Sequence, residues 1–550
     1  MNIFTRRQVL RSAAVVAAAG GVGSLGAGAA ADMAAAAGTG AFRHGVASGD
    51  PWADSVLLWT RVTPSPDALP GSGMGPDVTV GWEIAADAGF RNVVARGKAT
   101  AGPARDHTVK VIAGRLAPRQ DYWYRFTWGQ SVSPVGRTRT APAIGSPVDR
   151  LKFGVVSCAN WQAGYFSSYR HLARRGDLDA VLHLGDYLYE YGVGEYQARD
   201  TVVRPHEPAH EMTQLEHYRR RHAQYKSDAD LQALHAAAPF IVTWDDHESA
   251  NDAWKGGAEN HTQGIEGAWT DRAAAAQQAY AEWMPVRYEQ GGQIYRRLDF
   301  GSLASLSMLD LRSYRDQQAV NGTDGAVQDP ARTITGAAQM DWLLGNLTSS
   351  GPQWKLVGNP VMIAPVRVPS TLSTAELAGV QKLMGGTNIS GIPYNVDQWD
   401  GYEADRSRVV AHLRDNAVKD AVFLTGDIHS GWACDIPADP ATYPATGDSV
   451  ATELVCTSVT SDNLDDILGV PPRTGSLAVE GAIKAANPHV KYLDFDSHGY
   501  SVLEVTPAGV RMDWYVLAER TSAGSGSTLS TTFNVHANTG KVTPAQGGPS

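Results

Sequence analysis

Hydrophobic and polar residues alternate in short segments over the first part of this chain. From about residue 42 to residue 141, short apolar runs are separated by turn-forming clusters, and no long helical pattern interrupts them. The runs occupy residues 55–62, 78–84, 107–111 and 122–126. Such a series is typical of a small β-sandwich. We therefore predict an all-β domain of the immunoglobulin or fibronectin kind over residues 39–147.

The pattern changes beyond residue 147, where apolar strands alternate with amphipathic helical segments. Helices are expected over 166–175 and within 213–235. Strands are expected at residues 153–158, 180–186, 239–246, 304–310, 354–359 and 420–427. This alternation predicts an α/β sheet whose functional residues lie at strand ends. We assign residues 148–525 to one catalytic domain. The Gly-, Ser- and Thr-rich residues 526–550 are expected to form a loosely structured tail with a weak strand at residues 531–535.

Residues 1–38 differ from both parts. An arginine pair, Arg6 and Arg7, precedes a weakly apolar run of Ala, Gly and Val. This arrangement is typical of a twin-arginine export signal, with cleavage expected between residues 29 and 40. A membrane anchor is the less favoured alternative, because a lipid-spanning helix needs about 20 strongly apolar residues. We expect the twin-arginine translocation machinery to deliver the protein to the cell envelope or the medium, with no stable membrane anchor.

Composition and charge narrow the class of protein. The chain has 550 residues, of which 43% are hydrophobic and 19% are charged. These values describe a globular protein in water and exclude a disordered, fibrous or polytopic membrane protein. The formal net charge of -10 provides no overall basic field, so we expect no nucleic-acid partner. We expect a monomer.

The three cysteines cannot all be paired within one chain. Cys434 and Cys456 could form a disulfide in an oxidising compartment, which would leave Cys158 unpaired. The twin-arginine route carries folded proteins, often with a metal or cofactor already installed. A cysteine left over in such a protein is therefore a candidate metal ligand.

Candidate metal ligands follow four of the predicted strands. The segments are Ser157-Cys158-Ala159-Asn160, Gly185-Asp186-Tyr187-Leu188-Tyr189-Glu190, Trp244-Asp245-Asp246-His247-Glu248 and Gly426-Asp427-Ile428-His429. Any one of them alone is weak evidence, because a single Gly-Asp or His at a strand end is more often structural. Four in succession at the same structural position predict one site at the carboxyl edge of a sheet. The three-residue spacing of Asp186 and Tyr189 also brings both onto one side of a turn.

These segments, behind a β-rich N-terminal part and a twin-arginine signal, resemble the alkaline phosphatase D (PhoD-like) family. The same pattern is found in the purple acid phosphatases and other calcineurin-like metallophosphoesterases. The resemblance implies a four-layer α/β sandwich, ferric iron with calcium at the active site, and hydrolysis of phosphate monoesters and diesters. Some exported actinobacterial members of the family are instead iron-dependent phospholipases D, so small phosphate esters and phospholipids are both candidate substrates.

The resemblance also implies a role for individual residues. The ligands of one ferric ion would be Cys158, Asp186, Tyr189 and His429. Asp186 would bridge the iron to a second ion, which Asp427 would also bind. This second ion is expected to be Ca²⁺, and one or more Ca²⁺ could be bound. All-oxygen ligands suit a hard divalent cation. Either Asp246 or Asn251 would complete that second site, and their spacing does not choose between them.

His247 is the candidate catalytic residue. It would donate a proton or a hydrogen bond to the leaving oxygen or the transition state. The alternative is that it only orients Asp246. Arginines that could hold the phosphate are not distinguished by the sequence. The candidates in loops are Arg204, Arg312, Arg315 and Arg367.

Alternative functions remain open at this point. A phospholipase D would share every motif with a phosphomonoesterase and phosphodiesterase. A noncatalytic secreted binding protein could use the N-terminal domain for recognition, but it would have no need for four intact sets of ligands. A zinc hydrolase is a further possibility. Cys158 with Tyr189 fits ferric iron better than zinc, because tyrosinate stabilises a trivalent ion.

Overall fold

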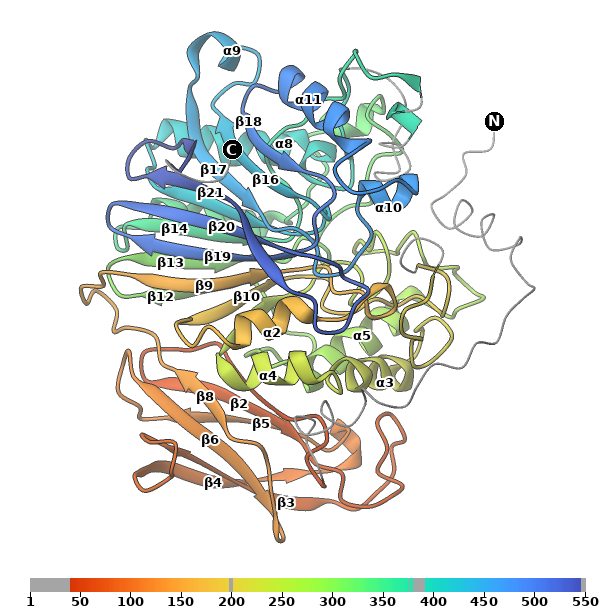
Figure 1. The fold of residues 1–550 in the computed structure, drawn as a ribbon, viewed down its shortest axis with the longest axis vertical. Coiled ribbons are helices and arrows are strands. Elements are labelled where there is room, and N and C mark those ends of the chain that lie inside the picture. Colours follow the sequence, from red (N-terminus) through yellow and green to blue (C-terminus); the bar gives the residue numbers. More distant parts are fainter. Residues whose placement is uncertain (1–39, 197–200, 375, 379–390, 546–550) are drawn as a thin grey trace.

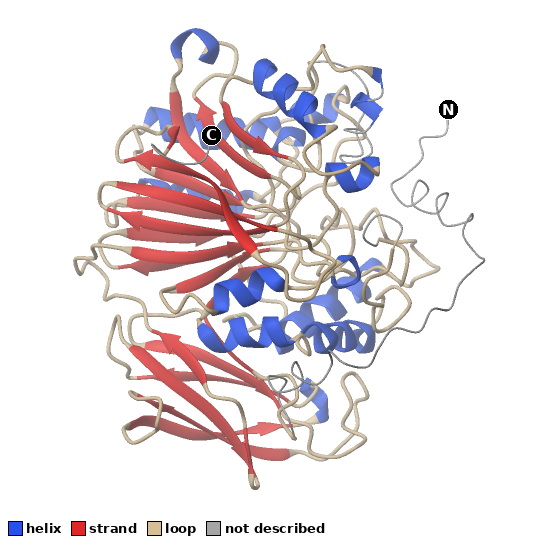
Figure 2. Cartoon of the chain, in the orientation of Figure 1, coloured by secondary structure: helices blue, strands red, loops and turns tan. Residues whose placement is uncertain are grey.

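The computed structural model describes residues 40–196, 201–374, 376–378 and 391–545. The predicted export signal at residues 1–38 lies outside these ranges. Among the described residues, none of the helices combines the length and the apolar character needed to cross a membrane. The strands of the described residues form three sheets, with helices on the outer sides of the two larger ones (Figures 1 and 2).

The N-terminal part contains two facing layers of strands. One layer is the small antiparallel sheet, made of β3 (Val78–Ala85), β4 (Val93–Ala101), β6 (Asp121–Trp128), β7 (Ser131–Val132) and β8 (Gly136–Arg139). The other layer is made of β1 (Val46–Gly49), β2 (Ser55–Arg61) and β5 (Thr108–Gly114), with the 3₁₀ turn η1 (Pro103–Arg105) before β5. Side chains of both layers share one core, which includes Leu58, Ile84 and Tyr124. Burial alternates along β6, as expected for a strand with one face on a core. The strands predicted for residues 42–141 are confirmed.

The second N-terminal layer is not a separate sheet. Gly49 of β1 pairs in parallel with Phe240 of β11, so β1, β2 and β5 extend the large sheet of the catalytic part. A Cβ atom at Gly49 would lie 1.7 Å from the carbonyl oxygen of Pro285, so only glycine permits this close approach. The N-terminal domain therefore shares a sheet with the rest of the molecule.

Within the described residues the large sheet has ten strands, in the order β22-β21-β20-β19-β9-β10-β11-β1-β2-β5. Those not yet given are β9 (Leu151–Val156), β10 (Ala180–Leu184), β11 (Phe240–Thr243), β19 (Gly499–Thr506), β20 (Gly509–Leu517), β21 (Ser527–His536) and β22 (Val542–Pro544). β9, β10 and β11 are parallel neighbours, so their carboxyl ends reach the same edge.

The expectation of a loosely structured C-terminal tail was wrong. Residues 527–544 form β21 and β22, which continue the large sheet beyond β20. Phe533, Val535 and Val542 are buried in the core between the larger sheets. The segment is mostly polar, so its composition did not indicate that these three apolar residues pack into the core.

The second sheet faces the large one. Its order is β12-β13-β14-β15-β17-β16-β18. The strands are β12 (Arg296–Phe300), β13 (Ala304–Met308), β14 (Trp354–Asn359), β15 (Ala421–Thr425), β16 (Gly431–Pro437), β17 (Ser449–Val455) and β18 (Val490–Asp494). Leu182 of the large sheet and Leu356 and Leu424 of the second sheet belong to one core, which fills the space between the sheets.

Helices cover the outer faces of both larger sheets (Figure 2). Those beside the large sheet are α2 (Ser167–Ala173), α3 (Leu215–Tyr225), α4 (Ala229–Ala237) and α5 (Trp269–Trp283), with η2 (Trp161–Ala163) before α2. The remaining helices and 3₁₀ turns are α6 (Ala337–Thr348), α8 (Glu403–Asp415), α9 (Tyr443–Thr446), α10 (Leu464–Leu468), α11 (Ser476–Ala486), η3 (Gly325–Gln328) and η4 (Trp399–Gly401). α6, α8 and α11 pack on the second sheet. The order of layers is thus helix, sheet, sheet, helix, and the predicted α/β fold with an N-terminal domain is confirmed.

The hypothesis of a disulfide between Cys434 and Cys456 was wrong. All three cysteines are free and buried. Cys434 lies in β16 and points into the core beneath the outer helices, whereas Cys456 follows β17 and points into the core between the sheets. Neighbouring strands cannot form a bridge between side chains on opposite faces of a sheet.

Candidate metal centre

The strand ends predicted to carry the site meet between the two larger sheets. Cys158, Asp186 and Asp246 lie just beyond the parallel strands β9, β10 and β11. Asp427 follows β15, which belongs to the second sheet. Two sheets therefore contribute to one cluster, because the ends of their parallel strands approach each other across the interface.

The backbone at these strand ends is held in an uncommon conformation. The φ angles are 60° at Cys158, 54° at Asp186, 61° at Asp427 and 54° at His429. Such left-handed conformations at residues other than glycine are costly and concentrate at functional sites. Glycines let the turns approach closely: a Cβ at Gly185 would lie 2.5 Å from Cβ of Asp245, and one at Gly426 would lie 2.7 Å from Cβ of Ser157.

The four residues that the resemblance implies as iron ligands are brought together. Donor atoms of Cys158, Asp186 and His429 lie within 4.8 Å of one another. The Tyr189 hydroxyl donates to Oδ2 of Asp186 at 2.9 Å and lies 3.2 Å from Nε2 of His429. All four side chains are buried. The structure thus supplies one thiol, one phenol, one imidazole and one carboxylate at a single point, and their role as ligands stays a prediction.

A loop that the sequence analysis did not identify orients two of these residues. Ser461 donates to the Tyr189 hydroxyl at 2.6 Å. Nδ1 of His429 lies 3.0 Å from the carbonyl oxygen of Asp462, which can only accept, so that nitrogen carries a proton and Nε2 faces the cluster. Arg520 binds the Asp462 carboxylate at 2.6 Å and so anchors the loop.

Two further groups of donors adjoin the first. Asp186, Asp246 and His247 form one group, and Asp245, Asp246 and Asp427 form the other, each with donor atoms within 4.8 Å. Asp186 is shared with the first group, and Asp246 is common to these two. The carboxylates therefore form a continuous row beside the thiol and phenol, which is an arrangement suited to more than one cation.

Arg312 supplies positive charge to this row of carboxylates. Its Nε lies 2.5 Å from Asp245, its Nη1 lies 2.8 Å from Asp397, and its Nη2 lies 3.5 Å from Asp427. Arg312 is buried and follows β13, with Arg312 and Asp427 more than a hundred positions apart. The sequence analysis listed Arg312 among the loop arginines without distinguishing it. It placed Asp245 in a ligand segment without a role of its own, and it missed Asp397.

His247 is held by a buried carboxylate. Its Nδ1 lies 2.8 Å from Oε2 of Glu190, and the other Glu190 oxygen accepts from the Asn251 backbone N–H and from Nδ2 of Asn260, both at 2.8 Å. Burial by itself disfavours the protonated imidazole, but Asp246 and Glu190 raise the pKa of His247 well above its usual value. These contacts favour the protonated ring, which can donate a proton.

Glu248 holds the turns of two strands together. Its carboxylate accepts from the backbone N–H groups of Asp186 at 3.2 Å, Tyr187 at 2.6 Å and Asp245 at 2.8 Å. Burial raises the pKa of Glu248 to about 7, against these three hydrogen bonds, which lower it. The sequence held a signal for both Glu190 and Glu248, because each is the last residue of a predicted ligand segment.

The donor chemistry and one unsatisfied atom fit a bound cation. Oδ1 of Asp186 is buried and has no hydrogen-bond partner. Burial, reinforced by the negative charge of Asp186, raises the pKa of both Cys158 and Tyr189, and burial raises that of Asp186 itself. A nearby cation reverses this effect because it stabilises the anionic forms.

The choice between Asp246 and Asn251 is narrowed by their contacts. Asp246 belongs to two of the donor groups. Asn251 donates its backbone N–H to Glu190, and its side-chain Nδ2 lies 3.3 Å from Glu259. The geometry thus favours Asp246, and a ligand role for Asn251 stays a prediction.

The other candidate arginines have carboxylate partners elsewhere. The pairs are Arg204 with Asp228 at 2.6 Å, Arg315 with Asp397 at 2.6 Å and Arg367 with Glu403 at 2.5 Å. Arg315 shares Asp397 with Arg312, so it contacts the cluster indirectly, through Asp397. Of these four arginines, Arg312 is the one that lies within 4 Å of Asp427.

Comparisons with known proteins agree with this arrangement. Residues 153–514 match the family described as PhoD-like phosphatase, and residues 27–142 match its N-terminal domain. Alkaline phosphatase D of Bacillus subtilis (strain 168) is 39% identical over 503 residues, which cover 90% of this chain and 80% of that protein. A solved structure described as "Structure of PhoD" is 36% identical, with a TM-score of 0.81, and covers 92% of this chain and 94% of its own.

Proposed function

This chain belongs to the PhoD-like phosphatase family and is a phosphoric ester hydrolase, and from that premise we propose that it is an exported, metal-dependent enzyme for small phosphate monoesters and diesters. The observation that carries the proposal is the meeting of Cys158, Asp186, Tyr189 and His429, with a buried Asp186 oxygen left unsatisfied. The layered fold around it supports placing the chain among the calcineurin-like metallophosphoesterases.

The two kinds of donor suit two kinds of cation. Thiolate, phenolate and imidazole around Asp186 would hold one ferric ion, because anionic ligands of this type stabilise a trivalent state. Asp186, Asp246 and Asp427 would hold Ca²⁺, which prefers oxygen ligands, and Asn251 could add one more. When bound, such cations polarise phosphoryl oxygens and lower the pKa of an attacking water.

A residue of the protein itself can protonate the leaving alcohol. Hydrolysis forms a bond between a water oxygen and phosphorus and breaks the bond from phosphorus to the alcohol oxygen, which must gain a proton. Glu190 occupies Nδ1 of His247, so Nε2 is the nitrogen that can donate that proton. Burial of both residues excludes water that would compete for it.

Export through the twin-arginine pathway to the cell envelope or the medium is part of the proposal. It is supported by the arginine pair and the weakly apolar run within residues 1–38. A metal site of buried, preorganised donors also suits a route that carries folded proteins. We propose that the exported enzyme is a monomer.

The first test is elemental analysis of the purified protein with a visible spectrum and assays on three esters. About one iron per chain, a tyrosinate charge-transfer band that Tyr189→Phe removes, and phosphate release from a monoester and a diester are expected. Zinc without a visible band would overturn the iron assignment. Release of choline from phosphatidylcholine, with no hydrolysis of small esters, would indicate a phospholipase D instead, and an inactive metal-free protein would overturn the enzyme proposal.

A further inference from the structure

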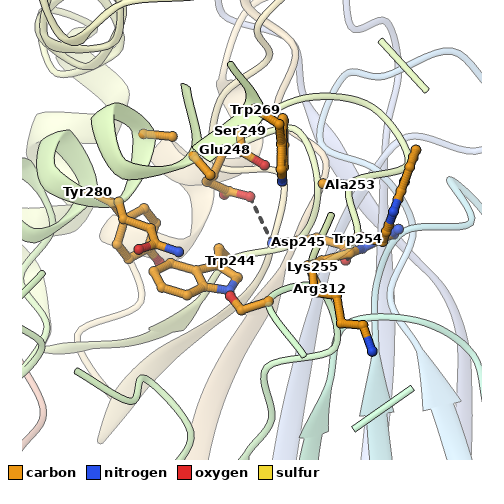
Figure 3. A pocket seen from close by; sticks show the side chains of 14 residues that line it. Trp244, Asp245, Glu248, Ser249, Ala253, Trp254, Lys255, Trp269, Tyr280 and Arg312 are labelled. Atoms are coloured by element: carbon orange, nitrogen blue, oxygen red, sulfur yellow. Dashed lines mark hydrogen bonds and ion pairs between the residues drawn. The ribbon is translucent and has the colours of Figure 1, made fainter. Parts of the chain in front are cut away.

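A pocket of about 80 Å³ lies beside the carboxylate cluster, and Figure 3 shows the side chains that line it. Its aromatic lining consists of Trp244, Trp254, Trp269 and Tyr280. Asp245 and Arg312 also line it, and these two residues belong to the carboxylate cluster as well. The pocket therefore shares the Asp245–Arg312 pair with the carboxylate cluster, and a group bound there would lie beside the candidate metal centre.

The inner wall of the pocket is rigid. Trp244 directly follows β11, and its ring meets Tyr280 edge to face with 5.3 Å between centroids. It meets Tyr288 in the same way at 5.1 Å. All three side chains are buried. Because neighbouring rings hold Trp244 on two sides, the indole is fixed in place before a ligand binds.

The outer wall depends on a tight turn. Trp254 and Gly257 exchange backbone hydrogen bonds of 2.8 and 3.2 Å. A Cβ at Gly257 would lie 2.5 Å from the Trp254 ring, so the indole packs directly on the glycine backbone. Lys255, at the exposed rim, is paired with Asp316 at 2.5 Å. The turn therefore presents an indole, and the lysine beside it already has a partner.

Small and polar residues complete the lining. Ala253 and two alanines of α5, Ala273 and Ala276, leave the space open between the rings. Ser249 and Gln277 offer hydrogen-bonding groups. Flat apolar walls with a few polar groups are typical of sites for small organic ligands.

We propose that this pocket binds the alcohol portion of the substrate and selects a planar aromatic group, such as an aryl or nucleobase-bearing ester. This inference rests on the proposed function, since it takes the phosphate to lie at the carboxylate cluster. Four aromatic side chains line the space for one planar group, and the serine and glutamine side chains can meet its polar edge. A pair of long acyl chains needs more room than this pocket provides.

The test compares benzyl phosphate with cyclohexylmethyl phosphate, which differ mainly in the planarity of the ring, and uses glycerol 1-phosphate as the small reference ester. The natural protein should favour benzyl phosphate in kcat/KM by about tenfold or more. Trp254→Ala, which removes one wall, and Ala273→Leu, which fills the space, should each lower kcat/KM for benzyl phosphate at least tenfold relative to glycerol 1-phosphate. Ala274→Leu, on the exposed face of the same helix, is the matched control.

Equal kcat/KM for the two ring esters, or equal losses on all three esters in both variants, would overturn the pocket assignment. Calorimetric titration with benzylphosphonate and cyclohexylmethylphosphonate, whose C–P bonds resist hydrolysis, tests binding without turnover. Tighter binding of the benzyl compound that both variants abolish supports the pocket even if none of the esters is hydrolysed, in which case the proposed function alone fails. Selective loss of phosphatidylcholine cleavage in both variants would assign the pocket to an acyl chain and overturn the aromatic proposal.

Discussion

Nδ1 of His247 lies 2.8 Å from a carboxylate oxygen of Glu190, and both side chains are buried. The two residues come from the ends of neighbouring strands, β11 and β10, which the chain separates by 57 positions. The carboxylate fixes the ring orientation and stabilises its protonated form.

Replacing His247 by Asn should lower kcat by about 100- to 10,000-fold, because positioned acid catalysis contributes that much. Glu190→Gln should lower kcat by about tenfold, since it leaves the imidazole in place but weakens its orientation. Steady-state kinetics on an ester with a poor leaving group measure both effects. Unchanged metal content in both variants is the control, and an unaltered kcat in His247→Asn would show that the ring only orients Asp246.

Arg520 is expected to control the metal centre without touching it. It binds Asp462 at 2.6 Å and Asp466 at 2.8 Å, and so holds the loop that contacts His429 and Tyr189. Arg520→Met should weaken retention of the proposed iron by about 10- to 100-fold and shift its expected visible band, because both predicted ligands lose their orientation. Metal content after dialysis against a chelator is the measurement.

The matched control for that variant is Arg511→Met, which removes an exposed arginine that pairs with Asp513 on β20. It should retain its metal as the natural protein does. Full retention of iron and an unshifted band in Arg520→Met would contradict a positioning role.

Arg312 should be required for stability as well as activity. Arg312→Met leaves the buried carboxylate of Asp245 without its partner and removes a cation from the partly buried Asp397 and Asp427, and breaking a buried pair from one side costs about 3–5 kcal/mol. The free energy of unfolding in urea measures the loss. Arg414→Met, which removes an exposed pair with Asp415, should leave it nearly unchanged. Equal stability of the two variants would refute the assignment.

Stability should fall as the pH rises from about 4.5 to 7, in part because of Glu453. This buried carboxyl accepts from Thr425 and from the backbone N–H groups of Ile363 and Ala364, yet burial raises its pKa to about 7. The folded state therefore binds a proton that the unfolded state has released in this window, which makes folding less favourable at higher pH. A shift of this size corresponds to about 3 kcal/mol.

The comparison of Glu453→Gln with the natural protein at pH 5 and pH 8 isolates this contribution. The variant cannot titrate at this position, so its deficit in the free energy of unfolding should be larger at pH 5 than at pH 8. An identical deficit at both pH values would contradict the raised pKa of Glu453.

Much of the fold could be predicted because the strands that carry the site are buried on both faces. Continuous apolar runs such as those before Cys158, Asp186 and Asp427 identify such strands, and parallel strands end at a common edge. The helices α3 and α4 were also expected, and Asp228 separates them by capping α4 through a hydrogen bond to the Leu231 N–H. The C-terminal strand β21 was largely missed, because its Ser and Thr residues resemble a polar linker.

The sequence by itself determined which residues could bind metal and that they stand at strand ends, because both properties depend on residue type and local pattern. Only the tertiary structure decided which groups lie beside these residues: Arg312 beside Asp245, Asp462 beside His429, and the aromatic pocket beside the Asp245–Arg312 pair. These contacts join segments from separate sheets and loops, and no local periodicity records them. The same reason separates Cys434 from Cys456, since the face to which a side chain points depends on the register of the whole sheet.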